Sequence, residues 1–563
     1  MVLAHDGKSS CRIVTPQKAT PQEGYAAKEL SSFLERISGA TLPIVTDEGP
    51  LGDSDILVGA VRQLSDIAPD IGVGELGQET SVLHQVGNHL VIVGGEPRGT
   101  LYGVYALLEE HLGCRFFAVD ETRVPSLDTV ELKGLDETIS PRLEYREPFY
   151  TEAFDGDFAA RSRMNSNRAL LEERHGGKIV YGSFVHTFYP LISPEEFFDD
   201  HPEYFSFSRE KAERFQERGQ LCLTNPDVLA ITIERVRGWC LRNPDIRIVS
   251  VSQNDWHGAC ECDNCAAIDE AEESQMGTML QFVNQVADAI RDDLPHVAVD
   301  TLAYQYTRKP PKTLIPRDNV IIRLCSIECC FSHTLDSDCG DNVAFADDIR
   351  GWSKICQRVY IWDYVTNFGH YVQPFPNFKV LASNIRFFAD HGVKGIFEEG
   401  NYATGGGGEL APLRSYVLSK LLWDPDSDPE IATKEFVEQY YGTASNTVME
   451  YLDLLHADVD DPDKHLHIFD RPDVLFLTDG FVAEALQLLE GALANITNEA
   501  TAQRMEMVIA PLIYLKWARL DESDPLRGAL LDRFEETARR GGVAFLSERT
   551  TLDAWLEKVR AGN

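Results

Sequence analysis

The 563-residue sequence lacks any run of about 20 apolar residues, so no membrane-spanning helix is expected and a membrane protein is excluded. Basic residues are also scarce, since 52 Lys and Arg stand against 90 Asp and Glu, for a formal net charge of −38. A field of this sign repels phosphate groups, which excludes nucleic acid and anionic membrane surfaces as partners. The acidic surplus itself is interpreted as a solubility feature.

The N-terminus lacks the apolar core of a secretory signal, because Asp6 and Lys8 come before any such segment. The 12 cysteines do not form the evenly spaced ladder of a disulfide-rich secreted domain, and internal repeats and low-complexity tracts are missing as well. We therefore expect mostly reduced thiols and a cytoplasmic protein, or a secreted one if the sequence has already been trimmed.

Apolar periodicity divides the chain into three predicted domains. Residues 1–138 alternate helical and strand patterns, with a helix expected over Tyr25–Ile37 and a strand over His89–Val93, and this predicts an α/β domain. Residues 429–563 carry Leu, Ile and Ala at helical spacing, for example over Phe481–Leu493, and this predicts a helical domain. We interpret that domain as a cap or a dimerisation region, so a homodimer is one expected assembly.

The predicted middle domain, residues 139–428, contains apolar strand-like runs separated by longer helical or loop segments. Their separation of roughly 25–50 residues is too wide for a β-sandwich and is typical of repeated βα units. Because about 250 residues is the normal size of a (β/α)8 barrel, the fold class predicted is α/β with a central TIM-type barrel. The runs are Ile246–Ser252, Val297–Leu302, Val320–Cys325, Val359–Trp362 and Val393–Phe397.

Acidic and polar residues follow four of these runs. Residues just past the carboxyl ends of barrel strands converge on one mouth, so we expect these side chains to share a site. A single loop acid is more often structural, whereas four strand ends with acids are harder to explain in that way. The residues are Asn254, Asp255 and Trp256, then Glu328, then Asp363 and Tyr364, and finally Glu398, Glu399 and Asn401.

Aromatic and amide residues, including Tyr304 and Asn367, lie beside these acids in the sequence. Rings stack on sugar faces and amides bind hydroxyl groups, so the pattern predicts a sugar site. Glycoside cleavage needs a general acid and a second group at the developing positive centre, and carboxylates in a partly apolar site can divide these roles. His186 and His333 fit no HExxH spacing and are interpreted as structural or as substrate-binding groups.

A cluster of three cysteines, Cys260, Cys262 and Cys265, resembles half of a zinc motif. A second half with CxxC spacing is missing, so a fourth ligand would have to be Cys222 or a cysteine within 325–330. Free thiols or a single disulfide are the alternatives. The prediction for a resident metal or cofactor is none.

Three long blocks resemble the signature segments of DUF4838 domain proteins, which are grouped as glycoside hydrolase family 163. Two further segments, 98–105 and 112–117, resemble the N-terminal α/β domain shared by α-glucuronidases and family 20 hexosaminidases. Together these likenesses cover most of residues 20–425. The three blocks are residues 250–262, 323–333 and 360–368.

The resemblance implies a barrel glycosidase, of β-N-acetylglucosaminidase type on N-glycan-derived oligosaccharides. It also implies retention by substrate assistance, in which the acetamido oxygen attacks and a carboxylate orients it. From the strand ends, we expect Glu328 to be the acid/base and Asp255 its partner. Because no export signal is found, an imported oligosaccharide is the expected substrate. The predicted substrate-binding residues are Asn254, Trp256, His186, Tyr304, His333, Asp363, Tyr364, Asn367, Glu398, Glu399 and Asn401.

Two alternatives stay open. The first is an α-glucuronidase-like hydrolase of uronic-acid-containing oligosaccharides, whose substrate carboxylate would need a basic clamp from Arg323, Arg308 or Lys309. The second is a non-catalytic barrel that binds carbohydrate. Chromogenic uronides and N-acetylglucosaminides would separate the two enzymatic hypotheses.

Overall fold

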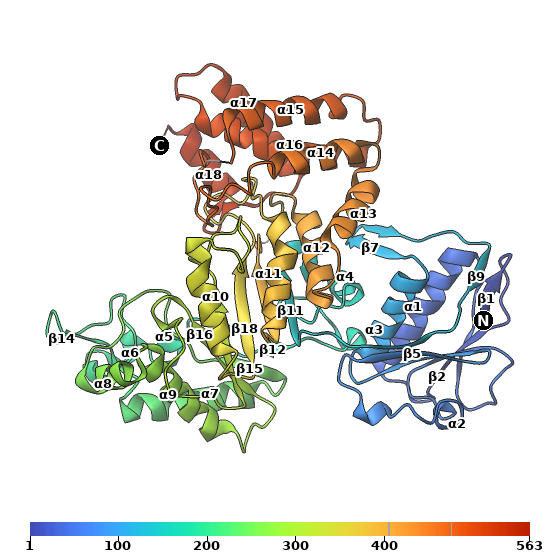
Figure 1. Ribbon diagram of the computed structural model, residues 1–563, viewed down its shortest axis with the longest axis horizontal. Coiled ribbons are helices and arrows are strands. Elements are labelled where there is room, and N and C mark those ends of the chain that lie inside the picture. The colour runs from blue at the N-terminus through green and yellow to red at the C-terminus, as the bar shows by residue number, and fades with distance from the viewer. Residues whose placement is uncertain (404–405, 475, 563) are drawn as a thin grey trace.

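The computed structural model describes residues 1–403, 406–474 and 476–562, and Figure 1 shows three parts in chain order: an N-terminal α/β part, a central parallel sheet with its helices, and a C-terminal group of helices. The predicted fold class, a TIM-type barrel between an α/β region and a helical region, is confirmed. The boundaries at residues 138 and 428 stay predictions. Within the described ranges, no helix combines the length and the hydropathy needed to cross a bilayer.

The N-terminal sheet has six strands in the order β10-β5-β6-β4-β2-β3. Helix α1 (Pro21–Ser38) packs on it and contains the helix predicted at Tyr25–Ile37. This helix begins after Thr20, whose hydroxyl accepts a backbone N–H bond, and ends at Gly39, whose φ of 74° suits a residue without a Cβ. The strands are β2 (Arg12–Thr15), β3 (Ile44–Thr46), β4 (Asp55–Val58), β5 (Ser81–Val86), β6 (His89–Gly94) and β10 (Asp136–Ile139), and the other helices here are α2 (Leu64–Ile67) and α3 (Gly99–Ala106).

The central sheet is curled and parallel, in the order β11-β19-β18-β17-β16-β15-β12. It has seven strands in the described part of the chain, where the ideal barrel has eight. The first strand, β11, pairs with the last, β19, as the first and last strands of a closed barrel do, and β11 and β12 lie at the two ends of the strand order. The five predicted runs correspond to its five later strands. The strands are β11 (Tyr145–Phe149), β12 (Val180–Tyr181), β15 (Ile246–Ser250), β16 (Ala298–Ala303), β17 (Val320–Cys325), β18 (Val359–Tyr364) and β19 (Gly395–Glu399).

Side chains of the central sheet alternate between two cores, as the two-residue period of a strand requires. One set, which includes Tyr145, Tyr360 and Phe397, fills the inside of the curl. The other set, which includes Ile322 and Ile361, joins the large core that also contains the surrounding helices. These helices are α4 (Gly156–Arg161), α5 (Phe188–Leu191), α6 (Pro194–Phe197), α7 (Pro226–Arg242), α8 (Asp263–Glu272), α9 (Met276–Ile290), α10 (Gly340–Trp352), α11 (Phe378–Asp390) and α12 (Ala411–Trp423).

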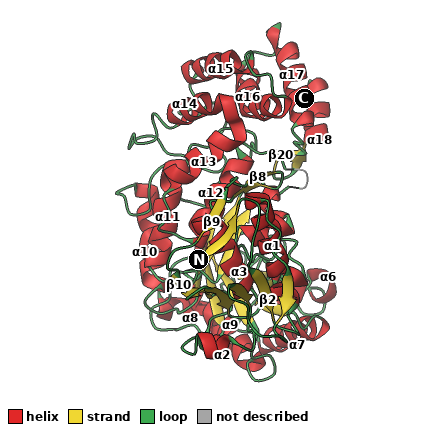
Figure 2. Ribbon diagram, turned by 90° about the vertical axis from the view of Figure 1, so that its right-hand side faces the viewer, coloured by secondary structure: helices red, strands yellow, loops and turns green. Residues whose placement is uncertain are grey.

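The C-terminal helices pack against one another in sequence order and lie together at one end of the molecule (Figure 2). Loops from this part return to the barrel, where the backbone N–H of Phe368 donates to the carbonyl of Ile468 over 2.8 Å and that of Glu548 donates to Phe368 over 3.0 Å. The C-terminal part therefore contributes to the barrel mouth. Its helices are α13 (Pro429–Tyr441), α14 (Ser445–Leu455), α15 (Asp479–Leu493), α16 (Glu499–Arg519), α17 (Leu526–Arg540) and α18 (Leu552–Arg560).

Four short two-stranded sheets complete the secondary structure that we describe. They are β1 (Val2–His5) with β9 (Thr129–Glu131), β7 (Arg115–Ala118) with β8 (Glu121–Arg123), β13 (Phe207–Ser208) with β14 (Glu213–Arg214), and β20 (Phe545–Ser547) with β21 (Thr550–Thr551). The last of these lies next to the barrel mouth through the contact of Glu548 with Phe368.

Candidate active site

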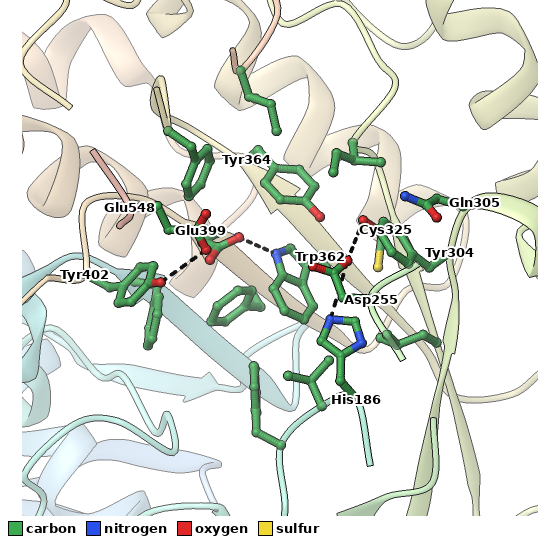
Figure 3. Close-up of a pocket in the computed structure, with 18 of the residues that line it drawn as sticks. His186, Asp255, Tyr304, Gln305, Cys325, Trp362, Tyr364, Glu399, Tyr402 and Glu548 are labelled. Carbon is green, nitrogen blue, oxygen red and sulfur yellow. Dashed lines mark hydrogen bonds and ion pairs between the residues drawn. The ribbon is translucent and has the colours of Figure 1, made fainter. Parts of the chain in front are cut away.

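A cavity of about 540 Å³ opens at the carboxyl ends of the barrel strands (Figure 3). This volume is in the range of small-molecule sites, and most of the wall is aromatic or aliphatic, as such sites usually are. The aromatic wall includes Phe149, Phe184, Trp362 and Phe397, whose rings contact one another. An apolar cavity of this kind can hold the faces of a sugar ring.

Glu399, the last residue of β19, is the acidic group most enclosed by this wall. Its carboxylate accepts a hydrogen bond of 2.8 Å from the indole Nε1 of Trp362 on the neighbouring strand. Burial raises the pKa of Glu399 to about 8, although the Trp362 hydrogen bond acts in the opposite direction. At neutral pH the group therefore carries a proton that it can donate.

Asp255 lies in the same cavity but is more exposed to solvent, with 47% of its side chain accessible. It follows β15 on the loop after the strand, where the hydroxyl of Tyr304 donates to its Oδ1 over 3.1 Å. The Nε2 atom of His186 is 3.8 Å from the same oxygen. These neighbours hold the Asp255 carboxylate in place beside the aromatic wall (Figure 3).

A third carboxylate, Glu548, reaches the cavity from the C-terminal part. The hydroxyl of Tyr402 donates to it over 3.4 Å, and the guanidinium of Arg549 lies 3.8 Å away. The Arg549 side chain is 82% exposed. Among the described lining residues, Arg549 is the one permanently charged cation.

Asp363 and Glu398 are register partners on β18 and β19, but neither lines the cavity. Successive residues of a strand point to opposite faces, so Glu398 is directed away from the face on which Glu399 lies. Burial raises the pKa of Asp363 to about 6 and that of Glu398 well above its usual range, with the Asp363 charge adding to the second effect. Ser326 donates to Asp363, whereas the Glu398 carboxylate has no hydrogen-bond partner among the described residues.

Glu328, the predicted acid/base, is placed outside the residues that line the cavity. The loop after β17 directs its carboxylate to Arg308, whose Nη1 lies 2.9 Å away. Arg308 also donates to Asp348 over 2.7 Å. In this arrangement Glu328 is part of an ion-pair group with Arg308 and Asp348.

Asn254 and Trp256 flank Asp255 in the sequence, but their polar atoms bind the protein itself. The amide of Asn254 and the indole N–H of Trp256 both donate to the carbonyl of Gly219, over 3.1 Å and 2.7 Å. Neither side chain lines the cavity. Both hold the loop that presents Asp255.

The predicted ligands Asn367, Asn401 and His333 are also outside the cavity lining. The Asn367 amide donates to the carbonyl of Asp470 over 2.8 Å, and the Asn401 side chain accepts the backbone N–H of Ala403 over 3.3 Å. His333 lies in a separate group of cysteine and histidine residues. Of the predicted site residues, the structure brings together His186, Asp255, Tyr304, Tyr364 and Glu399.

Several lining residues were not among the predicted site residues. Phe149 is the last residue of β11 and Phe184 follows β12, two strands without a long apolar run, so the strand-end argument could not reach them. Ile468, Phe469 and Glu548 come from the C-terminal part, for which no local pattern indicated contact with the barrel. In the sequence, Trp362 precedes Asp363 and Tyr402 follows Asn401, so both adjoin predicted site residues.

The three cations suggested as a clamp for a uronic acid are engaged elsewhere. Arg323 forms a buried ion pair with Asp300, with Nη2 2.9 Å from the carboxylate. Arg308 binds the carboxylates described above, and Lys309 donates to the backbone carbonyl of Glu273 over 2.9 Å. None of the three lines the cavity.

A solved structure with a TM-score above 0.5 supports the fold. A family GH115 4-O-methyl-α-glucuronidase with specificity for decorated arabinogalactans superposes with a TM-score of 0.58 at 12% identity, over 96% of this chain and 77% of that one. The CpGH89 protein from Clostridium perfringens, in complex with its substrate GlcNAc-α-1,4-galactose, has a TM-score of 0.49 at 11% identity, over 92% and 64%. At such identities the likeness concerns the fold alone. Curated protein sequences give no match.

Two family models match the sequence, as the resemblances predicted. The glycosyl hydrolase family 67 N-terminus matches residues 4–107. The model described as domain of unknown function DUF4838 matches residues 116–453, which is more than half of the chain. The protein is therefore a member of the DUF4838 family, joined to an N-terminal domain of the family 67 type.

Proposed function

We propose that this protein is a glycoside hydrolase whose active site is the cavity at the barrel mouth. The observation that carries the proposal is that Glu399, with a pKa of about 8, and the solvated carboxylate of Asp255 line one aromatic cavity. Carboxyl groups in such different environments can divide the roles of proton donor and charged partner. The family 67 type of the N-terminal domain also supports a glycosidase.

In the proposed reaction Glu399 is the general acid and takes the role first expected of Glu328. Its proton moves to the glycosidic oxygen as the bond from that oxygen to the anomeric carbon breaks. The indole N–H of Trp362, 2.8 Å from the carboxylate, stabilises the negative charge that then forms on Glu399. In the second step the same carboxylate takes a proton from the attacking water.

Asp255 is the proposed partner carboxylate. In substrate-assisted retention it accepts a hydrogen bond from the acetamido N–H, so that the acetamido oxygen attacks the anomeric carbon and forms a cyclic oxazolinium intermediate. Water then opens this ring and restores the acetamido group. The Tyr304 hydroxyl, 3.1 Å from Asp255, and the nearby His186 hold the carboxylate for this role.

The proposed substrate is an N-acetylglucosamine-type sugar in a β-linked oligosaccharide. The family resemblance supports this class, and the contacting rings of Phe184, Trp362 and Phe397 offer an apolar surface for the acetamido methyl group and a sugar face. A neutral sugar also suits a wall on which Arg549, itself next to Glu548, is the one arginine among the described lining residues.

A uronic-acid-containing substrate is the second candidate, and the position of Arg549 in the wall is the observation that favours it. The structurally similar GH115 protein is an α-glucuronidase, which agrees with this alternative. Against it, Arg549, the one arginine among the described residues of the cavity wall, is highly exposed and already close to Glu548. Exposed ion pairs of this kind contribute little binding energy.

The test is hydrolysis of matched N-acetylglucosaminide and glucuronide oligosaccharides, with products identified by mass spectrometry. We expect release of N-acetylglucosamine-type products by the wild-type protein, and a change of less than about threefold in Arg549→Ala, because a neutral sugar needs no cation. Cleavage of uronides that is lost in Arg549→Ala would establish the second candidate. Sugar binding without turnover of either class would reject the hydrolase proposal in favour of a binding barrel.

A further inference from the structure

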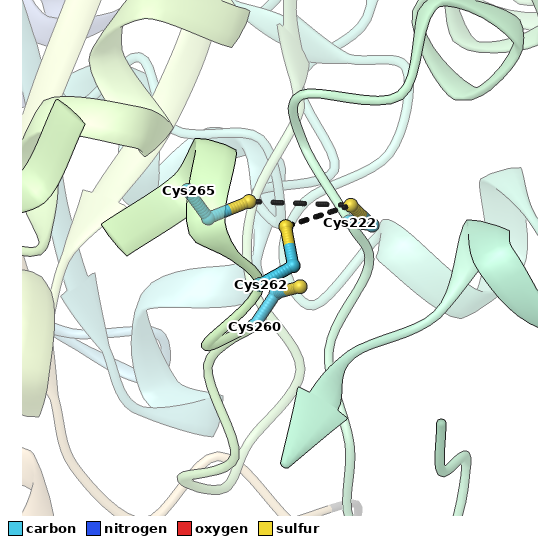
Figure 4. A group of neighbouring side chains, drawn as sticks. All are labelled: Cys222, Cys260, Cys262 and Cys265. Atoms are coloured by element: carbon cyan, nitrogen blue, oxygen red, sulfur yellow. Dashed lines mark hydrogen bonds between the residues drawn. The ribbon is translucent and has the colours of Figure 1, made fainter. Parts of the chain in front are cut away.

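Four cysteines outside the cavity converge at one point, and we propose that Cys222, Cys260, Cys262 and Cys265 together bind one structural Zn²⁺ ion. Their sulfur atoms all lie within 4.8 Å of one another (Figure 4). Sγ of Cys222 is 3.7 Å from that of Cys262 and 4.0 Å from that of Cys265. A tetrahedral zinc ion with Zn–S bonds of about 2.3 Å has sulfur–sulfur edges of about 3.8 Å.

The same distances argue against the alternatives considered for the cysteine motif. A disulfide requires sulfur atoms about 2 Å apart, and all four cysteines are free. The fourth ligand is Cys222, one of the two sources that the sequence left open. Because four soft ligands surround a space that suits one ion, a mononuclear tetrahedral site fits better than isolated thiols.

Groups around the sulfur atoms suit the charge of a zinc tetrathiolate. Binding of Zn²⁺ to four thiols releases four protons to solvent and leaves a complex with net charge −2. The Arg214 guanidinium lies 3.5 Å from Sγ of Cys260, which also accepts the backbone N–H of Phe207 over 3.4 Å. Thr224 Oγ1 is 3.2 Å from Sγ of Cys265. Such outer partners orient the ligands and stabilise their charge.

The position of the site indicates its use. Cys260 and Cys262 end the loop that carries Asp255, and Cys265 is in the first turn of α8, whereas Cys222 precedes α7. A metal here would tie this loop to a distant segment of the chain. The site would therefore hold Asp255 in the cavity wall without taking part in the reaction.

A second group, Cys330, His333, Cys339 and His465, carries the same inference independently. Its four ligand atoms also lie within 4.8 Å of one another. Nδ1 of His333 is 3.4 Å from Sγ of Cys330, and Nδ1 of His465 is 3.6 Å from Sγ of Cys339. Two cysteines and two histidines form a common tetrahedral zinc site.

The outer contacts of this second group again suit a metal. Nε2 of His333 lies 3.2 Å from the carbonyl oxygen of Asp461, and a metal-bound histidine usually donates its other ring N–H in this way. Three of the ligands follow β17, while His465 belongs to the loop that continues to Ile468 and Phe469 in the cavity wall. A Zn²⁺ ion would therefore fasten the C-terminal loop to the barrel rim.

The experiment uses the full-length wild-type protein, produced with zinc in the medium. Elemental analysis is expected to give two zinc ions per chain. X-ray absorption at the zinc edge is expected to show, averaged over two sites, about three sulfur and one nitrogen ligands per ion, with Zn–S near 2.3 Å. These measurements need no variant, so a variant that fails to fold does not remove the test.

Substitutions then separate the sites. Cys262→Ser should lower the zinc content from two to one, His465→Ala should do the same, and the pair should lower it to none. Cys240→Ser and Cys356→Ser, which change buried cysteines outside both groups, should keep two ions. A wild-type protein without zinc would overturn both sites, and a disulfide between Cys222 and Cys262 would overturn the first. One zinc ion with sulfur ligands only would support the first site and overturn the second.

Discussion

Glu399 accepts a 2.8 Å hydrogen bond from Nε1 of Trp362 across two neighbouring parallel strands. The bond favours the ionised carboxylate, whereas burial favours the protonated form more strongly, and the resulting pKa is about 8. A group with this pKa can give up a proton and take it back near neutral pH. This relationship is the basis of the catalytic proposal and of the first two predictions.

Glu399→Gln should lower kcat/KM by about 100-fold or more on an oligosaccharide, because general acid catalysis contributes roughly that much. The loss should be far smaller on an aryl glycoside with an acidic leaving group, which needs little protonation. Glu398→Gln is the matched control, because Glu398 adjoins Glu399 in the sequence but is directed away from the cavity, and this variant should stay within about threefold of wild type. Equal losses on both substrates would argue against a proton-donor role.

The pH dependence of kcat/KM should report the ionisation of Glu399. Since Glu399 must be protonated, kcat/KM should fall as pH rises through about 8. Trp362→Phe removes the N–H that stabilises the ionised form, so the pKa should rise and the alkaline limb should move to higher pH. A profile of kcat/KM against pH for both proteins measures this. An unmoved limb, or one shifted toward acid, would contradict the assignment.

Asp255→Asn should lower kcat by about 100-fold or more, because the amide cannot stabilise positive charge at the reacting centre. Tyr304→Phe removes one hydrogen bond of 3.1 Å to that carboxylate, a contact worth at most about 1.5–3 kcal/mol, and should cost roughly tenfold. Asn254→Ala offers a contrast, because its amide holds the loop without lining the cavity. It should affect thermal stability more than kcat.

Glu398 should make the folded protein less stable at alkaline pH. Burial raises its pKa in the folded state, so the native protein keeps a proton that the unfolded chain loses above about pH 4.3. The contribution of Glu398 to the free energy of unfolding is fully present below that pH and is lost as the pH rises toward the pKa of Glu398 in the folded state. Glu398→Gln should therefore raise the thermal midpoint relative to wild type at pH 8.5 more than at pH 4. If the difference in thermal midpoint between Glu398→Gln and wild type were the same at both pH values, Glu398 would not hold a proton in the folded protein.

The strand pattern predicted much of the barrel because its five later strands are apolar runs. The two earlier strands were missed for physical reasons. Tyr145–Phe149 contains Pro148 and two buried charged residues, Arg146 and Glu147, of which Arg146 pairs with the distant Glu79. The other strand, β12, has only two residues. The pairing of β11 with β19 depends on long-range contacts that no local pattern contains.

The rule that residues past the carboxyl ends of barrel strands converge on one mouth indicated which edge of the sheet carries the acids. It did not indicate which acid faces the cavity. Glu398 and Glu399 differ by one position, and a shift of one residue along a strand moves a side chain to the opposite face. Glu328 lies beyond the end of its strand, where loop geometry and Arg308 determine its direction. Glu548 reaches the cavity only through tertiary packing of the C-terminal part.

The most direct test compares Glu399→Gln with Glu328→Gln on one β-linked N-acetylglucosaminide oligosaccharide that the wild-type protein cleaves. If the cavity is the active site, kcat/KM should fall about 100-fold or more in Glu399→Gln and stay within about fivefold of wild type in Glu328→Gln. A large loss in Glu328→Gln with nearly full activity in Glu399→Gln would place the chemistry outside the cavity and contradict the account.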